Sequence, residues 1–204
     1  MSRPGPRPGL TAQGRAIAAA LAALRRGEVV AFPTESSYGL AVDARSPAAL
    51  ARLFLVKQRE PGKPPPLLVD GVTMLMMLAA RVPARAQALI ARFWPGPLTL
   101  VLPARAELPE TIVSGSGVGA RHSSHALATQ LVTAFGGPLT ATSANLAGQP
   151  PALTAAEVRA ALPSVHVLDG GPAPGALPST VVRVGDDGTL TVLRAGAMDP
   201  GLLS

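Results

Sequence analysis

The sequence predicts an α/β fold, a single domain in which a twisted, mixed β-sheet is flanked by helices. Hydrophobic residues make up 48% of the 204 positions and charged residues 15%, so the chain can bury a substantial core. Short apolar segments alternate with segments of helical periodicity, and no repeat or break in composition divides the chain. One mixed-sheet domain is the simplest arrangement of such elements.

The first helix is predicted over 10–26, where Ile17, Leu21 and Leu24 recur at helical spacing and Gly27 ends the pattern. The later helices are predicted from the same helical spacing of apolar residues. Two of them also have a recognisable start signal. Ser46 precedes a proline at a favoured first position, and Thr154 stands three residues before a glutamate, the spacing of a capping box. The later helices are predicted over 47–56, 71–80, 84–92, 124–135 and 154–162.

The strands are predicted where short apolar or β-branched runs are bounded by proline, glycine or polar residues. The run 111–121 is interpreted as a weak strand, a glycine-rich turn and a second strand, because its centre reads SGSGVG. The other strands are predicted over 28–32, 38–42, 67–69, 97–102, 138–141, 165–168, 180–184 and 189–193.

The N-terminal composition and the longest apolar run indicate where the domain starts and where in the cell the protein is located. Residues 1–9 are rich in proline, glycine and arginine and are expected to form a disordered tail before a domain at 10–204. The longest unbroken apolar run, Ala16–Leu24, has nine residues, whereas a membrane span needs about 18. We therefore expect a cytoplasmic protein with no membrane partner.

The absence of cysteine restricts the chemistry. It excludes disulfides, thiolate nucleophiles, iron–sulfur clusters and cysteine-bound zinc. The three histidines, His122, His125 and His166, leave little for a histidine-based metal site, so no protein-held metal is expected.

The charge points to an anionic partner. The formal net charge is +6 and the isoelectric point is about 11.2, which suits nucleotide phosphates or RNA. The chain strongly prefers arginine over lysine and contains only two lysines, one asparagine, one tyrosine and one tryptophan. Residue types that such a bias suppresses should persist mainly where chemistry or packing requires them.

Both lysines fall in one basic, proline-rich segment, KQREPGKPPP at 57–66. Lys57 and Arg59 would point the same way if this segment were extended, and Lys63 follows closely. Three cations near one point suit a polyphosphate. From spacing alone, a solvated basic loop is an equally good interpretation.

Two polar turns follow predicted strands, where α/β proteins bind ligands. Thr34 and Ser36 lie in one of them, and Ser143 and Asn145 alternate in the other, offering a hydroxyl and an amide to one ligand. The alternative is an ordinary polar turn, which serine and asparagine commonly form. The single asparagine of the chain tilts the second turn toward function.

Three short motifs carry less weight. GSGVGA at 115–120 resembles a dinucleotide-binding string but lacks an acidic residue about twenty positions later, so it is interpreted as a turn. Gly62 and Lys63 lack the remainder of a phosphate-binding P-loop. The run 123–125, SSH, has no nucleophile elbow around it and is not taken as a hydrolase triad.

Taken in order, these segments resemble the YrdC-like family of threonylcarbamoyl-AMP synthases, in its single-domain form. The resemblance covers 28–196 and its specificity comes from the number and order of the matching strings. These are FPTESSYGL (32–40), KQREPGKPPPLLV (57–69), FWPGPLTLVL (93–102), GARHSSH (119–125), PLTATSANLAG (138–148), LDGG (168–171), PSTVV (178–182) and LRAG (193–196).

The resemblance implies a single YrdC-like domain with a basic concave cavity, and an enzyme of the nucleotidyltransferase class. Such an enzyme combines L-threonine, bicarbonate and ATP, the last with Mg²⁺, into threonylcarbamoyl-AMP and pyrophosphate. A tRNA threonylcarbamoyl-transferase complex then modifies tRNA downstream. The chemistry consists mainly of positioning two anions and neutralising charge, which suits a chain without an evident nucleophile.

The resemblance also implies roles for individual residues. Arg121 matches a position that can pair bidentately with the threonine carboxylate. The residues expected to carry catalysis are Lys57, Arg59, Ser143 and Asn145. The expected ATP-binding residues are Lys57, Arg59, Lys63, Ser143, Asn145 and Arg194. The expected threonine-binding residues are Thr34, Ser36, Arg121 and Ser179.

The sequence departs from the family pattern mainly on the amino-acid side. Asp70 stands where the family often has histidine, and His122 and Ser123 stand where it usually has valine and proline. Asp70 either borders the amino-acid pocket or caps a helix. Two other functions stay open: a non-catalytic factor that binds tRNA or double-stranded RNA in ribosome maturation, and a paralogue that adenylates a different carbamate.

Overall fold

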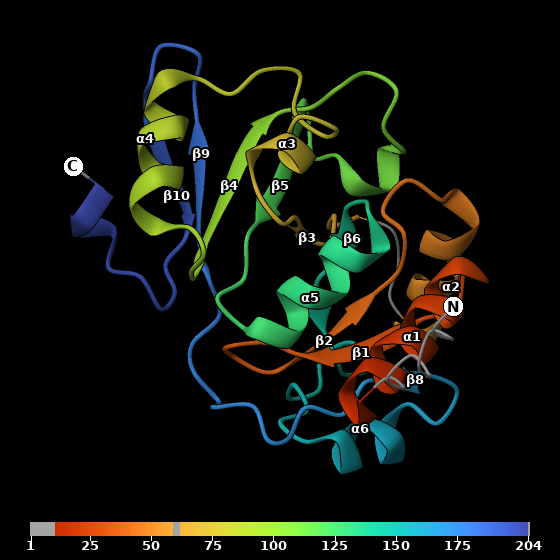
Figure 1. Ribbon diagram of the computed structural model, residues 1–204. Helices are drawn as coiled ribbons and strands as arrows, with labels where there is room; N and C mark the ends of the chain where they lie inside the picture. Colours follow the sequence, from red (N-terminus) through yellow and green to blue (C-terminus); the bar gives the residue numbers. More distant parts are fainter. Residues whose placement is uncertain (1–10, 59–61, 204) are drawn as a thin grey trace, which may run out of the picture.

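The computed structural model describes residues 11–58 and 62–203, and Figure 1 gives their arrangement. The tail predicted at 1–9 lies outside the described residues. Within those residues, none of the helices combines the length and the apolar character that crossing a membrane requires. The helices are α1 (Ala12–Arg25), α2 (Pro47–Lys57), α3 (Val72–Leu75), α4 (Ala84–Phe93), α5 (Ala126–Phe135) and α6 (Ala155–Ala161), with 3₁₀ turns η1 (Glu110–Ile112) and η2 (Pro200–Leu203).

The strands are short and belong to two sheets within the described part of the chain. The larger sheet has the order β10-β9-β4-β5-β3-β6 and the smaller sheet the order β7-β2-β1-β8, and both mix parallel and antiparallel pairs. The strands are β1 (Val30–Pro33), β2 (Tyr38–Ala41), β3 (Leu67–Leu68), β4 (Leu98–Pro103), β5 (Gly117–Arg121), β6 (Leu139–Thr140), β7 (Thr142–Ser143), β8 (His166–Val167), β9 (Thr180–Val184) and β10 (Leu190–Arg194).

The mixed α/β architecture predicted from the sequence is confirmed, with one difference: the segment predicted as a single strand at 138–141 connects two sheets. β6 pairs with β3, and β7 pairs with β2. Between β6 and β7 the amide of Ala141 donates to the carbonyl oxygen of Pro66, at the point where the chain passes from one sheet to the other. Figure 1 shows the strands of the two sheets running in clearly different directions.

The predicted helix start signals are confirmed. Ser46 caps α2 by accepting from the amide of Ala49, and Thr154 with Glu157 forms the capping box of α6. α1 and α5 pack against each other and against β1, and the apolar residues between them join one continuous core. This core includes residues of both sheets.

Two sequence-based expectations are wrong. The helix predicted over 71–80 is confined to α3, because the chain then turns so that Ala80 donates to the carbonyl of Pro103 at the end of β4. The weak strand predicted at the start of 111–121 is replaced by η1. The glycine-rich turn that follows is confirmed: Gly115 has a φ of 60°, and β5 starts at Gly117.

Candidate functional site

A cavity of about 740 Å³ lies between the two sheets, at the ends of β1, β2, β5, β7, β9 and β10. Its volume is in the range of small-molecule sites. Among the described residues that line it are three basic side chains, those of Lys63, Arg121 and Arg194, and no acidic one. The polar lining therefore suits a ligand with several negative charges.

Hydroxyl groups from the turn between β1 and β2 form one wall of the cavity. The hydroxyl of Thr34 donates to the carbonyl of Ser37 and lies 3.2 Å from the hydroxyl of Ser36. Thr34 also accepts from the amides of Ser36 and Ser37, which fixes the turn. The two predicted threonine-binding hydroxyls are thus side by side and both line the cavity.

Arg121 ends β5 and reaches the same cavity from a buried position. Burial, and then the positive charge of Arg194, lower the pKa of Arg121 to about 10, so it remains charged at neutral pH. Its guanidinium forms an ion pair with Glu35, and the Glu35 carboxylate also accepts a hydrogen bond from Ser123. Sequence reasoning missed this acidic partner of Arg121.

Arg194 and Ser179 face each other across the last strand pair. The Arg194 guanidinium donates to the carbonyl of Ser179 at 2.8 Å and to its hydroxyl at 3.3 Å. The register between β9 and β10 is irregular between Val192 and Arg194. The hydroxyl of Ser179 also lies 2.8 Å from that of the buried Thr99 on β4, a second residue that sequence reasoning missed.

Lys57 is placed differently from the expectation of an extended loop, which was wrong. It is the last residue of α2, and Gln58 after it has a left-handed φ of 49°. Only 3% of Lys57 is exposed, and its ammonium group donates to the carbonyl oxygens of Ser143 and Asn145 and to the side-chain oxygen of Asn145. Lys57 therefore supports the loop that carries Ser143.

Asn145 belongs to the same cluster. Its side-chain oxygen accepts from Ser143 at 2.6 Å, and its amide nitrogen donates to the carbonyl of Gln149. Ser143 lines the main cavity, whereas Asn145 lines a neighbouring cavity of about 460 Å³ that shares the residues Pro150, Pro151 and Leu153 with the first.

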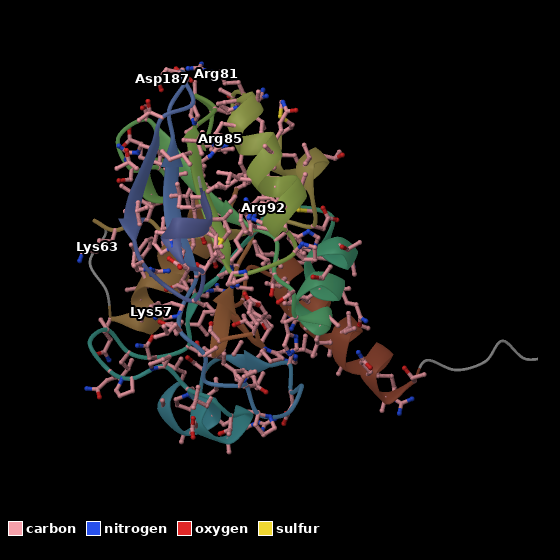
Figure 2. The ribbon with its side chains drawn as sticks, turned by 90° about the vertical axis from the view of Figure 1, so that its left-hand side faces the viewer. Lys57, Lys63, Arg81, Arg85, Arg92 and Asp187 are labelled. Carbon is pink, nitrogen blue, oxygen red and sulfur yellow. The ribbon has the colours of Figure 1, made fainter. Side chains whose placement is uncertain are left out.

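The remaining basic residues differ in position. Lys63 is exposed and lines the main cavity, and Figure 2 shows it at the surface with Lys57 further inside the molecule. Arg59 lies outside the described residues. Arg85 and Arg92 on α4 lie well apart from the two lysines in that view. Arg85 donates to the carbonyl of Leu203, which ties it to the C-terminal segment.

Asp70 does not cap α3, and it does not line the main cavity. The residue at the cap position of α3 is Gly71, without a side-chain hydrogen bond, and Asp70 is not among the residues that line the cavity. Its charge instead acts on His122, raising the pKa of that imidazole while burial lowers it more strongly.

The arrangement combines cations, hydroxyls and an apolar wall around one space. Glu35 could have been suspected from the sequence, because it is an acid placed between hydroxyls directly after a buried strand. Thr99 gives no local signal, since a threonine in a strand is ordinary. The expected residues that line the cavity are Thr34, Ser36, Lys63, Arg121, Ser143, Ser179 and Arg194.

Comparison with known proteins gives consistent matches. A family model for the Sua5/YciO/YrdC domain, described as "Telomere recombination", matches residues 22–196. A threonylcarbamoyl-AMP synthase of Chromohalobacter salexigens is 44% identical over 167 residues, covering 81% of this chain and 90% of that protein. The synthase of Thiobacillus denitrificans is 39% identical over 196 residues, covering 95% and 97%.

Solved structures also match this chain over most of its length. Sua5 of P. abyssi complexed with L-threonine has a TM-score of 0.84 and 33% identity, covering 92% of this chain. This chain spans 56% of that longer protein. YciO of E. coli has a TM-score of 0.80 and 28% identity, with 94% of both chains covered. On the family match and these relatives, the chain belongs to the Sua5/YciO/YrdC family.

Proposed function

We propose that this protein is an L-threonylcarbamoyladenylate synthase, a nucleotidyltransferase that serves the threonylcarbamoyl modification of tRNA. The observation that carries the proposal is the cavity of about 740 Å³, in which Arg121, Arg194 and Lys63 meet the hydroxyls of the two polar turns. The relatives named threonylcarbamoyl-AMP synthase, and the threonine complex of P. abyssi Sua5, support this choice of substrates.

The proposed reaction has two steps. Bicarbonate takes up a proton and breaks into carbon dioxide and water. The amine of threonine then adds to the carbon of carbon dioxide and loses a proton, which gives a carbamate and balances the proton taken up. A carbamate oxygen then attacks the α-phosphorus of ATP, the bond from that phosphorus to the bridging oxygen breaks, and pyrophosphate leaves. Both partners are anions, so the enzyme contributes mainly orientation and charge neutralisation.

The charge and position of each residue suggest its role in binding the substrates. Arg121 pairs with the carboxylate of threonine, and Thr34 and Ser36 offer hydroxyls near it. Lys63, Arg194 and Ser143, which line the same cavity, bind the nucleotide phosphates. Lys57 and Asn145 hold the Ser143 loop, and Arg59 is proposed as a further phosphate ligand.

We propose that Mg²⁺ enters with ATP. The described residues contain no group of three or more histidine or acidic side chains that could hold a metal, and Mg²⁺ commonly binds through substrate phosphates. When bound it neutralises phosphate charge. The reaction is proposed to take place in the cytoplasm, with a tRNA threonylcarbamoyl-transferase complex as the consumer of the product.

The test is pyrophosphate release by purified protein with ATP, bicarbonate and each amino acid in turn. We expect release to require all three substrates, with threonine preferred, and threonylcarbamoyl-AMP to be identified by mass. Release with another amino acid only would instead indicate the paralogue. No release, together with tight binding of double-stranded RNA, would indicate the RNA-binding factor.

A matched pair of variants links the activity to the site. Arg121→Gln removes the proposed carboxylate ligand, and we expect the KM for threonine to rise on the order of tenfold or more. Arg92→Gln makes the same change on α4, away from the cavity, and is expected to retain wild-type kinetics. Equal kinetics for the two variants would reject the assignment of Arg121.

A further inference from the structure

Glu35 connects Arg121 to a serine that the proposed mechanism does not use. Glu35 lies in the turn between β1 and β2, and its carboxylate pairs with the Arg121 guanidinium through one oxygen. Its other oxygen accepts a hydrogen bond from the hydroxyl of Ser123. Ser123, Glu35 and Arg121 thus form a series of contacts, of which only Arg121 lines the cavity.

Arg121 needs such support because it is long, buried and close to another cation. A guanidinium has several rotatable bonds behind it, and only 7% of Arg121 is exposed. Burial lowers the pKa of Arg121 most, and the positive charge of Arg194 lowers it further, so the two cations repel each other. An anion behind the cavity wall offsets this repulsion and fixes the direction of the guanidinium.

Glu35 acts through Arg121 rather than on the substrate. It does not belong to the residues that line the cavity, whereas Arg121 does. The two oxygens of the Glu35 carboxylate contact Arg121 and Ser123.

Ser123 anchors the carboxylate to the start of α5. Only 1% of Ser123 is exposed. Its hydroxyl donates to Glu35 and accepts from the backbone amide of His125 at 3.1 Å, where α5 starts. The helix, the serine and the carboxylate are thus connected by hydrogen bonds whose donors and acceptors are defined.

We propose that Glu35 and Ser123 are positioning residues that hold Arg121 in the orientation that receives the carboxylate of the amino-acid substrate. This inference rests on the proposed function. It predicts that a change at Ser123, which lines no part of the cavity, selectively weakens binding of the amino acid.

The experiment measures steady-state kinetics of Ser123→Ala with threonine and ATP varied separately. We expect the KM for threonine to rise on the order of tenfold, while the KM for ATP and kcat change by less than about twofold. Ser123→Thr keeps the hydroxyl and should restore part of the affinity. Equal rises in both KM values, or no rise in either, would overturn the inference.

Thr129→Val is the matched control. Thr129 on α5 donates through its hydroxyl to the carbonyl of Ser123 at 3.0 Å, a hydrogen bond that does not involve Glu35. It removes a hydroxyl hydrogen bond from the same helix start, so it reports general loosening of this region. Wild-type kinetics are expected. A threonine-specific KM rise as large as that of Ser123→Ala would overturn the inference.

A double-mutant cycle with Glu35→Gln tests whether Ser123 acts through Glu35. We expect the effects on the KM for threonine to be strongly non-additive, because Glu35→Gln already removes the charged partner of Arg121 through which Ser123 is proposed to act. Additive effects would reject the connection. If Glu35→Gln does not fold, the comparison of Ser123→Ala with Thr129→Val decides alone.

The wild-type protein separates the two levels of the proposal. Absence of threonine-dependent pyrophosphate release by the wild type would overturn the proposed function and this inference with it. Threonine-dependent release by the wild type, with an unchanged KM for threonine in Ser123→Ala, would overturn this inference alone.

Discussion

The ammonium group of Lys57 lies 2.9 Å from the side-chain oxygen of Asn145, 88 residues further along the chain. The first residue ends α2 and the second follows β7, so the contact ties a helix end to the loop beside the smaller sheet. One of the two lysines and the single asparagine of the sequence thus meet. Their position behind Ser143 gives the loop a defined shape next to the cavity.

The two lysines should respond differently to the same substitution. Lys57→Met leaves the part-buried carbonyl oxygens of Ser143 and Asn145 without their charged donor, so the free energy of unfolding should fall by about 2–3 kcal/mol. Lys63→Met is at an exposed position and should change stability by less than about 0.5 kcal/mol while raising the KM for ATP. Urea unfolding and ATP kinetics measure both. Equal stability of the two variants would contradict the buried role of Lys57.

Asn145→Ala should cost both stability and activity. It removes an acceptor from Lys57 and Ser143 and a donor from the carbonyl of Gln149, and we expect a loss of about 1–3 kcal/mol. Asn145→Asp keeps the acceptor and should retain more activity than the alanine variant. Thermal unfolding and pyrophosphate release would be compared, and a fully active, wild-type-stable alanine variant would argue against any role for this side chain.

Gly196→Ala should disturb the cavity through the backbone. A Cβ at this position would lie 2.2 Å from the carbonyl oxygen of Pro178 and 2.6 Å from the carbonyl carbon of Ser179, and neither can move independently. We expect a loss of about 1–3 kcal/mol and a marked fall in activity as Ser179 shifts. Gly119→Ala is the control, because its nearest contacts are side-chain atoms at 3.6 Å. Similar behaviour of the two variants would disprove the backbone explanation.

Stability should fall in mild acid because of two histidines. Burial lowers the pKa of His122 and His125 from 6.5, so below about pH 6.5 the unfolded chain binds more protons than the folded one. The stability that neutral imidazoles provide is therefore present above this pH and lost as the pH falls. In urea unfolding between about pH 7.5 and 5.5, the His122→Asn/His125→Asn variant should lose less stability than the wild type. An identical pH slope would rule the histidines out.

Asp70→Asn should change a titration and leave catalysis unchanged. The Asp70 charge raises the pKa of His122, so its removal should lower that pKa further, as an NMR titration of the imidazole would measure. Because Asp70 lies outside the cavity lining, the KM for threonine should stay within about twofold of the wild type. A tenfold change in that KM would instead indicate that Asp70 borders the amino-acid pocket.

Local signals in the sequence determined most of the elements and several site residues. Ser46 and Thr154 mark helix starts because a side-chain oxygen satisfies amides only a few residues away. The hydroxyls after β1 and Ser143 on β7 could be singled out because polar residues after buried strands commonly lie at ligand sites. These signals act over a few residues and can be read without the fold.

The tertiary structure alone decided which side chains meet. Lys57 and Asn145, Glu35 and Ser123, and Thr99 and Ser179 are each separated by at least 80 residues, and the pattern around one member carries no information about the other. Whether a cation faces solvent, a loop or a cavity depends on long-range packing that orders both partners at once. The family resemblance in the sequence therefore identified Arg121 as a candidate ligand. Its pairing with Glu35 depends on the packing of β5 beside the turn after β1, which only the tertiary structure shows.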